Sequence, residues 1–118
     1  MNLTKRMTSW VSTLGVHIAT ADKNGFPTVI VVHSANVEEE HITVQLTPSQ
    51  VKQIEDNISI NPRIALAPGG IGSIRAPYQF KGTAKLSGEK LITEVKEIYC
   101  TKPGAEAGIR LDTMGYKS

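Results

Sequence analysis

The residues from Thr47 to Lys52 combine a helix start with groups that can hold an anion. Thr47 can cap a helix, Pro48 suits its first position, and Gln50 completes a Thr-x-x-Gln capping box. A helix that starts in this way presents unpaired backbone N–H groups and the positive end of its dipole, which together favour a phosphate or another anion. Lys52 follows within the next turn and could add a positive charge. Most capped amphipathic helices bind nothing at this end, so the pattern alone also allows a purely structural helix.

An apolar stripe predicts how this helix is held against a core. Val51, Ile54 and Ile58 recur at i, i+3 and i+7 and so share one face of the helix. Asn61-Pro62 ends the helix, because the residue before a proline is disfavoured in the helical conformation. A strand over Arg63–Ala67 is expected directly afterwards.

Before the helix, the patterns predict one short helix near residues 4–14 and three strands. The strands cover Val16–Ala21, Pro27–Ser34 and His41–Thr47, and the turn residues Asp22–Gly25 join the first two. Thr28–Val32 is a continuous β-branched run, which is typical of a strand covered on both faces. We therefore expect this strand either inside a barrel or beneath a partner. Residues 38–40 are all glutamate and predict an exposed turn.

After the helix, we expect a glycine-rich loop, one long strand and a final helix. The loop, Pro68–Ser73, lacks the Gly-Lys-Ser/Thr ending of a Walker loop and is interpreted as a hairpin connection that could touch a ligand. Tyr78–Leu86 alternates, and Gly82 within it predicts a bulge or a close backbone approach. Ser87 can cap a helix from Gly88 to about Thr101. The tail, 105–118, has one possible edge strand around residues 109–114.

This order of elements predicts a mainly β fold, a small antiparallel β-barrel of about six strands with peripheral helices. The 118 residues suffice for one core, so residues 1–118 are expected to form a single domain. The net charge of +2, the absence of long basic runs and the scarcity of aromatic residues argue against a nucleic-acid partner.

Cysteine usage and hydropathy bear on where the protein works. The single Cys100 allows no internal disulfide, and the three scattered histidines show no zinc spacing. The N-terminus lacks the apolar segment of a signal peptide, and no apolar run is long enough to span a membrane. We expect a cytoplasmic protein without a membrane partner, with Cys100 buried as a small apolar side chain.

Three pieces of the chain resemble the FMN-binding split barrels related to pyridoxamine 5′-phosphate oxidase. They are Gly15–Pro27 with the strand after it, Ser49-x-x-Lys52 leading into Asn57–Arg63, and Tyr78–Ala84, in the order of that family. The resemblance covers a core of about residues 14–86 and leaves a C-terminal helix and tail at 87–118. It implies a six-stranded split barrel that forms a homodimer with two FMN molecules at the subunit interface.

The resemblance also implies where the cofactor lies. The FMN phosphate is expected near the start of the central helix, and the flavin ring along the end of the second strand, largely against backbone groups. Three further contacts, from the region after residue 73, could belong to the same or to the partner subunit. In chain order the implied cofactor-binding residues are Val31, Val32, His33, Ser34, Ser49, Gln50, Lys52, Asn57, Arg75, Gln79 and Lys81.

No acid and base pair stands out for catalysis. His33 is the nearest candidate, although a partly buried structural histidine beside Ser34 is the better interpretation of the sequence. With FMN bound, the chain is predicted to be a flavin-dependent oxidoreductase or electron-transfer protein whose redox partner is unknown. Two alternatives remain open: a split barrel for a deazaflavin or haem, and a non-enzymatic dimeric domain that binds a small anion.

Overall fold

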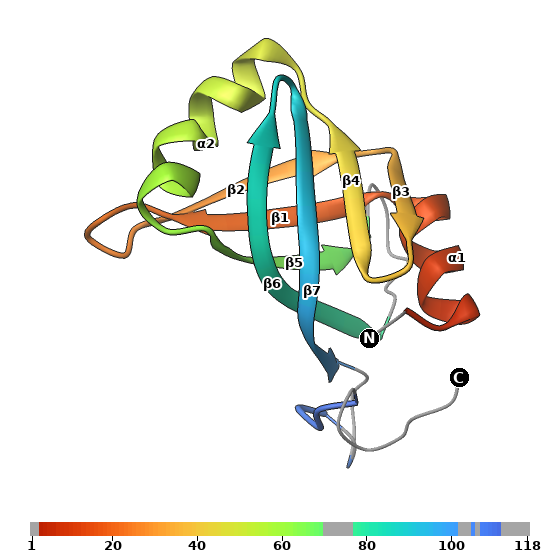
Figure 1. Ribbon diagram of the computed structural model, residues 1–118. Helices are drawn as coiled ribbons and strands as arrows, with labels where there is room; N and C mark the ends of the chain where they lie inside the picture. The colour runs from red at the N-terminus through yellow and green to blue at the C-terminus, as the bar shows by residue number, and fades with distance from the viewer. Residues whose placement is uncertain (1–2, 70–76, 102–104, 106, 112–118) are drawn as a thin grey trace.

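The computed structural model describes residues 3–69, 77–101, 105 and 107–111, which form one antiparallel sheet with two helices (Figure 1). The mainly β class with peripheral helices is therefore confirmed. In chain order the elements are α1 (Lys5–Leu14), β1 (Val16–Ala21), β2 (Pro27–Val32), β3 (Ala35–Glu38), β4 (His41–Gln45), α2 (Pro48–Ile60), β5 (Arg63–Pro68), β6 (Tyr78–Ser87) and β7 (Lys90–Cys100).

The sheet curls into a half-barrel. Its seven strands lie in the order β2-β1-β5-β6-β7-β4-β3, so β2 and β3 form its two edges. Only His33 and Ser34 separate these edge strands in the chain. Because the step from Val32 to Ala35 spans at most about 11 Å, the two edges must approach each other there. The long strand β6 pairs with β5 and with β7 and joins the two halves, which cross at a steep angle in Figure 1.

The inner face of the curled sheet carries the core. Residues alternate between buried and accessible along β1, β5 and β6, as a sheet with one covered face requires. The pairing of β6 with β7 shifts register between Lys81 and Gly82. A Cβ atom at Gly82 would lie 2.0 Å from the carbonyl oxygen of Glu94, so only glycine fits. The predicted bulge and close backbone approach at Gly82 are both confirmed.

The helices are fixed by their caps and by one apolar face each. Thr4 caps α1 by accepting a hydrogen bond from the Met7 amide at 3.3 Å, and the helix packs against β3. α2 lies across β1, β2 and β6 and buries Ile54 and Ile58. Its predicted capping box and its end before Pro62 are confirmed. Neither helix, in the part of the chain described, is long and apolar enough to cross a membrane.

The predicted third helix is wrong, because residues 90–100 form strand β7. Leu91, Val95 and Ile98 fit a helical stripe by spacing, but the buried Thr93 between the first two completes an alternating pattern instead. β6 supplies a partner along the whole of β7, and this long-range pairing outweighs the local helical spacing. Cys100 is buried as expected, but at the end of a strand.

Two further expectations about strands need correction. β3, of four residues, was not predicted. β3 and β7 add two strands and the strand expected near Ile109 is not formed, so the sheet has seven strands where six were predicted. The expected edge strand near Ile109 is reduced to a single bridge between Arg110 and Tyr99 within the described residues. β2 is not enclosed in a barrel within this chain, because Val29 on its outer face is 58% exposed.

Candidate functional site

One side chain joins the two segments in which the sequence predicts a ligand site. Gln50 at the start of α2 donates a hydrogen bond from Nε2 to the carbonyl oxygen of Val31 in β2, at 3.0 Å. Its Oε1 accepts from the Thr47 amide at 3.0 Å, and its own amide donates to Thr47 Oγ1 at 3.1 Å. Gln50 therefore holds the helix start against the end of β2. We call residues 31–34 and 47–52 together the β2–α2 corner.

The helix side of the corner offers groups suited to an anion. The first turn of α2 contains no acidic side chain to satisfy the positive end of the helix dipole. Ser49 and Lys52 are exposed, and Lys52 forms no ion pair with any described residue. Pro48 has no N–H and the Gln50 amide is bonded to Thr47, which leaves the Ser49 amide for a ligand. This N–H, the Ser49 hydroxyl and the Lys52 ammonium match the acceptor oxygens of a phosphate.

The strand side of the corner presents mostly backbone. Val32 is buried and Val31 half-buried, while His33 and Ser34 are exposed where the chain passes from β2 to β3. His33 is therefore not the partly buried histidine that the sequence favoured. An exposed imidazole and hydroxyl at this position are accessible to a ligand that lies along the end of β2.

Gly15 fixes the end of β2, a role that the sequence pattern did not indicate. A Cβ atom at Gly15 would lie 2.1 Å from the Val32 carbonyl oxygen and 2.7 Å from the His33 backbone. Its φ of 73° is also one that other residues rarely adopt. From the sequence, Gly15 could be predicted only to end a helix. Its contact with β2 joins residues that are far apart in the chain, so local sequence does not reveal it.

Of the four other predicted residues, three lie away from the corner and one lies outside the residues that the structure describes. The Asn57 amide is buried and donates to Thr20 Oγ1 at 3.0 Å, which ties α2 to β1. Gln79 and Lys81 lie on β6, separated from β2 by β1 and β5, or about 14 Å at the usual strand spacing. Within one chain they do not join the corner. Arg75 lies outside the described residues.

Lys81 instead borders a separate groove of about 390 Å³ on the outer face of the sheet, where Arg63 and Lys96 also contribute positive charge. Its ammonium lies 4.9 Å from the centre of the Tyr99 ring. The groove reaches Ala21 and Pro27, at the hairpin end of β1 and β2. It is therefore at the opposite end of these strands from Val32.

Apart from His17, the outer face of β2, β1 and β5 carries alanine and valine side chains, and Val29 on it is 58% exposed among the described residues. The strand registers place Val29 opposite Ala19 and Ala19 opposite Ala65, and in the next row Val31 opposite His17 and His17 opposite Ala67. We call this the alanine face, and it consists of His17, Ala19, Ala21, Val29, Val31, Ala65 and Ala67. Val31 belongs to it and to the β2–α2 corner, so the two features adjoin.

Comparison of sequences gives a relative but no family. No family model matches the chain. Among curated proteins, the uncharacterized protein MJ0282 of Methanocaldococcus jannaschii is 29% identical over an alignment of 131 residues, which covers 92% of this chain and 87% of the relative.

Solved structures give the clearer likeness. A candidate pyridoxamine 5′-phosphate oxidase from Lactobacillus delbrueckii superposes with a TM-score of 0.69 at 18% identity, over 84% of this chain and 94% of that one. HupZ from Group A Streptococcus superposes with a TM-score of 0.67 at 22% identity, over 90% and 99%. The chain therefore shares the split-barrel fold of these proteins, and at such identities the likeness shows the fold alone.

Proposed function

We propose that this chain is an FMN-binding flavoprotein, a flavin-dependent oxidoreductase or electron-transfer protein that acts as a homodimer. The observation that carries the proposal is the hydrogen bond from Gln50 to Val31, which brings the N-terminus of α2 against an accessible strand end. The split-barrel fold, shared with a candidate pyridoxamine 5′-phosphate oxidase, supports it.

The residues of the corner fit the phosphate of FMN. The hydroxyl and backbone amide of Ser49 and the ammonium of Lys52 would hold the phosphate, because no carboxylate of the first turn of α2 competes for them. Gln50 would act indirectly, since both ends of its side chain already bind the protein. Asn57 would likewise support the helix rather than the ligand, because its amide is buried against Thr20.

The end of β2 would receive the flavin ring. Val31 to Ser34 supply backbone groups, and the exposed His33 and Ser34 supply an imidazole and a hydroxyl. FMN supplies the hydride or electron chemistry when bound, while the protein positions the ring and limits access to it. The corner contains no carboxylate, so we assign no catalytic acid and base pair to it.

A second subunit would complete the site through the alanine face. This face is mostly apolar and is continuous with the corner through Val31, so a partner docked on it would cover the side of the site that one chain leaves open. Gln79 and Lys81 lie on β6 beyond β5 and could reach a cofactor only from the partner's side.

The test is a fluorescence titration of the purified protein with FMN and, in parallel, with riboflavin, which lacks the phosphate. The proposal predicts that the fluorescence of both flavins is quenched on binding. FMN should bind more tightly, because its phosphate interacts with the helix N-terminus. Sedimentation of the same samples should show a dimer. A protein that binds neither flavin contradicts the proposal, as does a monomer that retains FMN.

The second candidate is a non-redox dimeric domain that binds a small anion at the same helix N-terminus. The lack of a carboxylate in the corner favours it, since anion binding needs donors but no acid and base pair. Binding of inorganic phosphate without any flavin would support this candidate. A deazaflavin or haem could bind at the same site instead of FMN. Its binding would be detected by absorption spectroscopy and would show that the site holds a different cofactor.

A further inference from the structure

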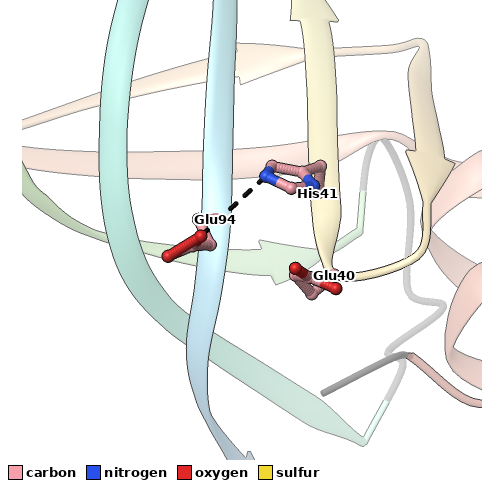
Figure 2. A group of neighbouring side chains, drawn as sticks. All are labelled: Glu40, His41 and Glu94. Carbon is pink, nitrogen blue, oxygen red and sulfur yellow. Dashed lines mark ion pairs between the residues drawn. The ribbon is translucent and has the colours of Figure 1, made fainter.

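We propose a second ligand site, independent of the cofactor proposal, in which Glu40, His41 and Glu94 bind a divalent transition-metal ion of the Zn²⁺ class. These residues lie on the β4–β7 side of the sheet, and Figure 2 shows them as neighbours, with an ion pair drawn between His41 and Glu94. His41 Nε2 lies 4.0 Å from Glu94 Oε2, and potential ligand atoms of all three residues lie within 4.8 Å of one another.

Strand pairing holds the three donors together. His41 and Glu94 are directly opposite in the antiparallel pair of β4 and β7, so their side chains project from the same face. Glu40 precedes β4, and its carbonyl oxygen accepts a hydrogen bond from the Val95 amide at 2.8 Å. The backbone that carries Glu40 is thus attached to β7 next to Glu94, and the cluster does not depend on a free loop.

The donor set selects the kind of metal. One imidazole nitrogen and two carboxylates suit Zn²⁺ and similar ions, whereas Ca²⁺ and Mg²⁺ prefer oxygen ligands alone. Bonds of about 2.0–2.2 Å place the donors on one zinc ion about 3.3 Å apart, so small side-chain rotations would close the site. The imidazole also distinguishes this cluster from an ordinary solvated group of acidic residues.

Two features around the cluster favour a bound ion. Lys96 pairs with Oε1 of Glu94, which leaves Oε2 directed at His41, and such an outer partner orients a ligating carboxylate. A hollow of about 270 Å³ opens onto His41 and Glu94, with Thr83, Lys85 and Ile92 on its walls. Three protein donors and an open hollow leave room for water or a small ligand in the remaining coordination positions.

Calorimetry with Zn²⁺ alone, on protein freed of metal by a chelator, tests the site. The wild type should bind Zn²⁺ far more tightly than Mg²⁺. His41→Ala and Glu94→Gln should each weaken Zn²⁺ binding by about tenfold or more, since even outer-shell changes cost that much. Glu38→Gln, which changes an exposed glutamate outside the cluster, should bind Zn²⁺ as the wild type does.

Thermal unfolding with and without Zn²⁺ provides a second measurement. An ion bound by Glu40, His41 and Glu94 would link the β3–β4 hairpin to β7, so Zn²⁺ should raise the unfolding midpoint of the wild type and of Glu38→Gln but not of His41→Ala. The proposal is overturned if the wild type shows no Zn²⁺ binding, or if His41→Ala binds Zn²⁺ as tightly as the wild type.

Discussion

The two edges of the sheet are built in opposite ways. β3 has only four residues, is flanked by α1, and ends at the exposed glutamates Glu38 and Glu39. β2 has six residues, a continuous β-branched run and an outer Val29 that is 58% exposed. Short length, a covering helix and charges are the usual ways to protect an edge strand, and β3 has all three. The apolar surface of β2 has no such protection, and the proposed dimer would cover it.

The largest expected effect comes from placing a charge on the unprotected edge. Val29→Lys should dissociate the proposed dimer, because an unpaired ammonium buried in an apolar interface costs about 3–5 kcal/mol. Asn36→Lys places the same side chain on the exposed surface of β3 and should leave the dimer intact. Sedimentation of the two variants decides the matter. If Val29→Lys is still a dimer, the alanine face is not the dimer interface.

The next effect concerns the contact that fixes the end of β2. Gly15→Ala should destabilise the protein by about 3 kcal/mol or more, because a new Cβ would overlap the backbone of Val32 and His33 at a φ of 73°. Gly25 has a similarly positive φ but no neighbour within 4 Å, so Gly25→Ala should cost only about 1–2 kcal/mol. Urea unfolding measures both. If both variants lose the same free energy of unfolding, the close contact of Gly15 with β2 does not contribute to the cost of the substitution.

The phosphate proposal predicts an effect of intermediate size. Lys52→Ala should weaken FMN binding by about 1–3 kcal/mol, the usual loss for one partner in a charge-assisted hydrogen bond. Riboflavin binding should hardly change, because riboflavin has no phosphate. Lys23→Ala, at the exposed turn between β1 and β2, is the matched control. Equal losses for FMN and riboflavin would show that Lys52 acts on the fold and not on the phosphate.

A smaller effect tests the link between α2 and β2. Gln50→Ala removes the capping-box partner of Thr47 and the hydrogen bond to Val31, and should lower the free energy of unfolding by about 1–2 kcal/mol. Gln53→Ala changes an exposed position of the same helix and should be nearly neutral. Denaturant unfolding compares the pair. Equal stabilities would mean that Gln50 does not hold the corner.

The features that were predicted correctly from the sequence depend mostly on residues close together in the chain. The capping box at Thr47 and Gln50 and the end of α2 before Pro62 depend on a few adjacent residues, and both were confirmed. β7 was mistaken for a helix because Leu91, Val95 and Ile98 are spaced as on a helix. In the strand, Val95 and Ile98 are both buried because the pairing with β6 shifts register between them. Only its partner strand decides between helix and strand, and local sequence does not contain that information.

The candidate site divides in the same way. Its two halves, at the end of β2 and the start of α2, were each predicted from local patterns or from family resemblance, and both remain predictions. The contacts that join them were not predicted, because Gln50 and Val31 lie 19 residues apart, and Asn57 and Thr20 lie 37 apart. The position of Lys81, across β1 and β5 from the corner, likewise follows from strand order and could not be obtained from spacing.

The smallest effect is expected on the protected side of the sheet. Lys96, hydrogen-bonded to Glu94, holds the pKa of that carboxyl below its ordinary value of 4.5. Since the folded pKa is the lower one, the pair stabilises the protein above that ordinary value, and the contribution is lost as the pH falls through the folded pKa. Lys96→Met should therefore be slightly less stable than the wild type at pH 7 and equal to it once Glu94 is protonated. Lys85→Met, an exposed lysine without an ion pair to a described residue, should show no such convergence in denaturant unfolding. A pH-independent difference for Lys96→Met would assign its effect to packing of the lysine stem rather than to the charge on Glu94.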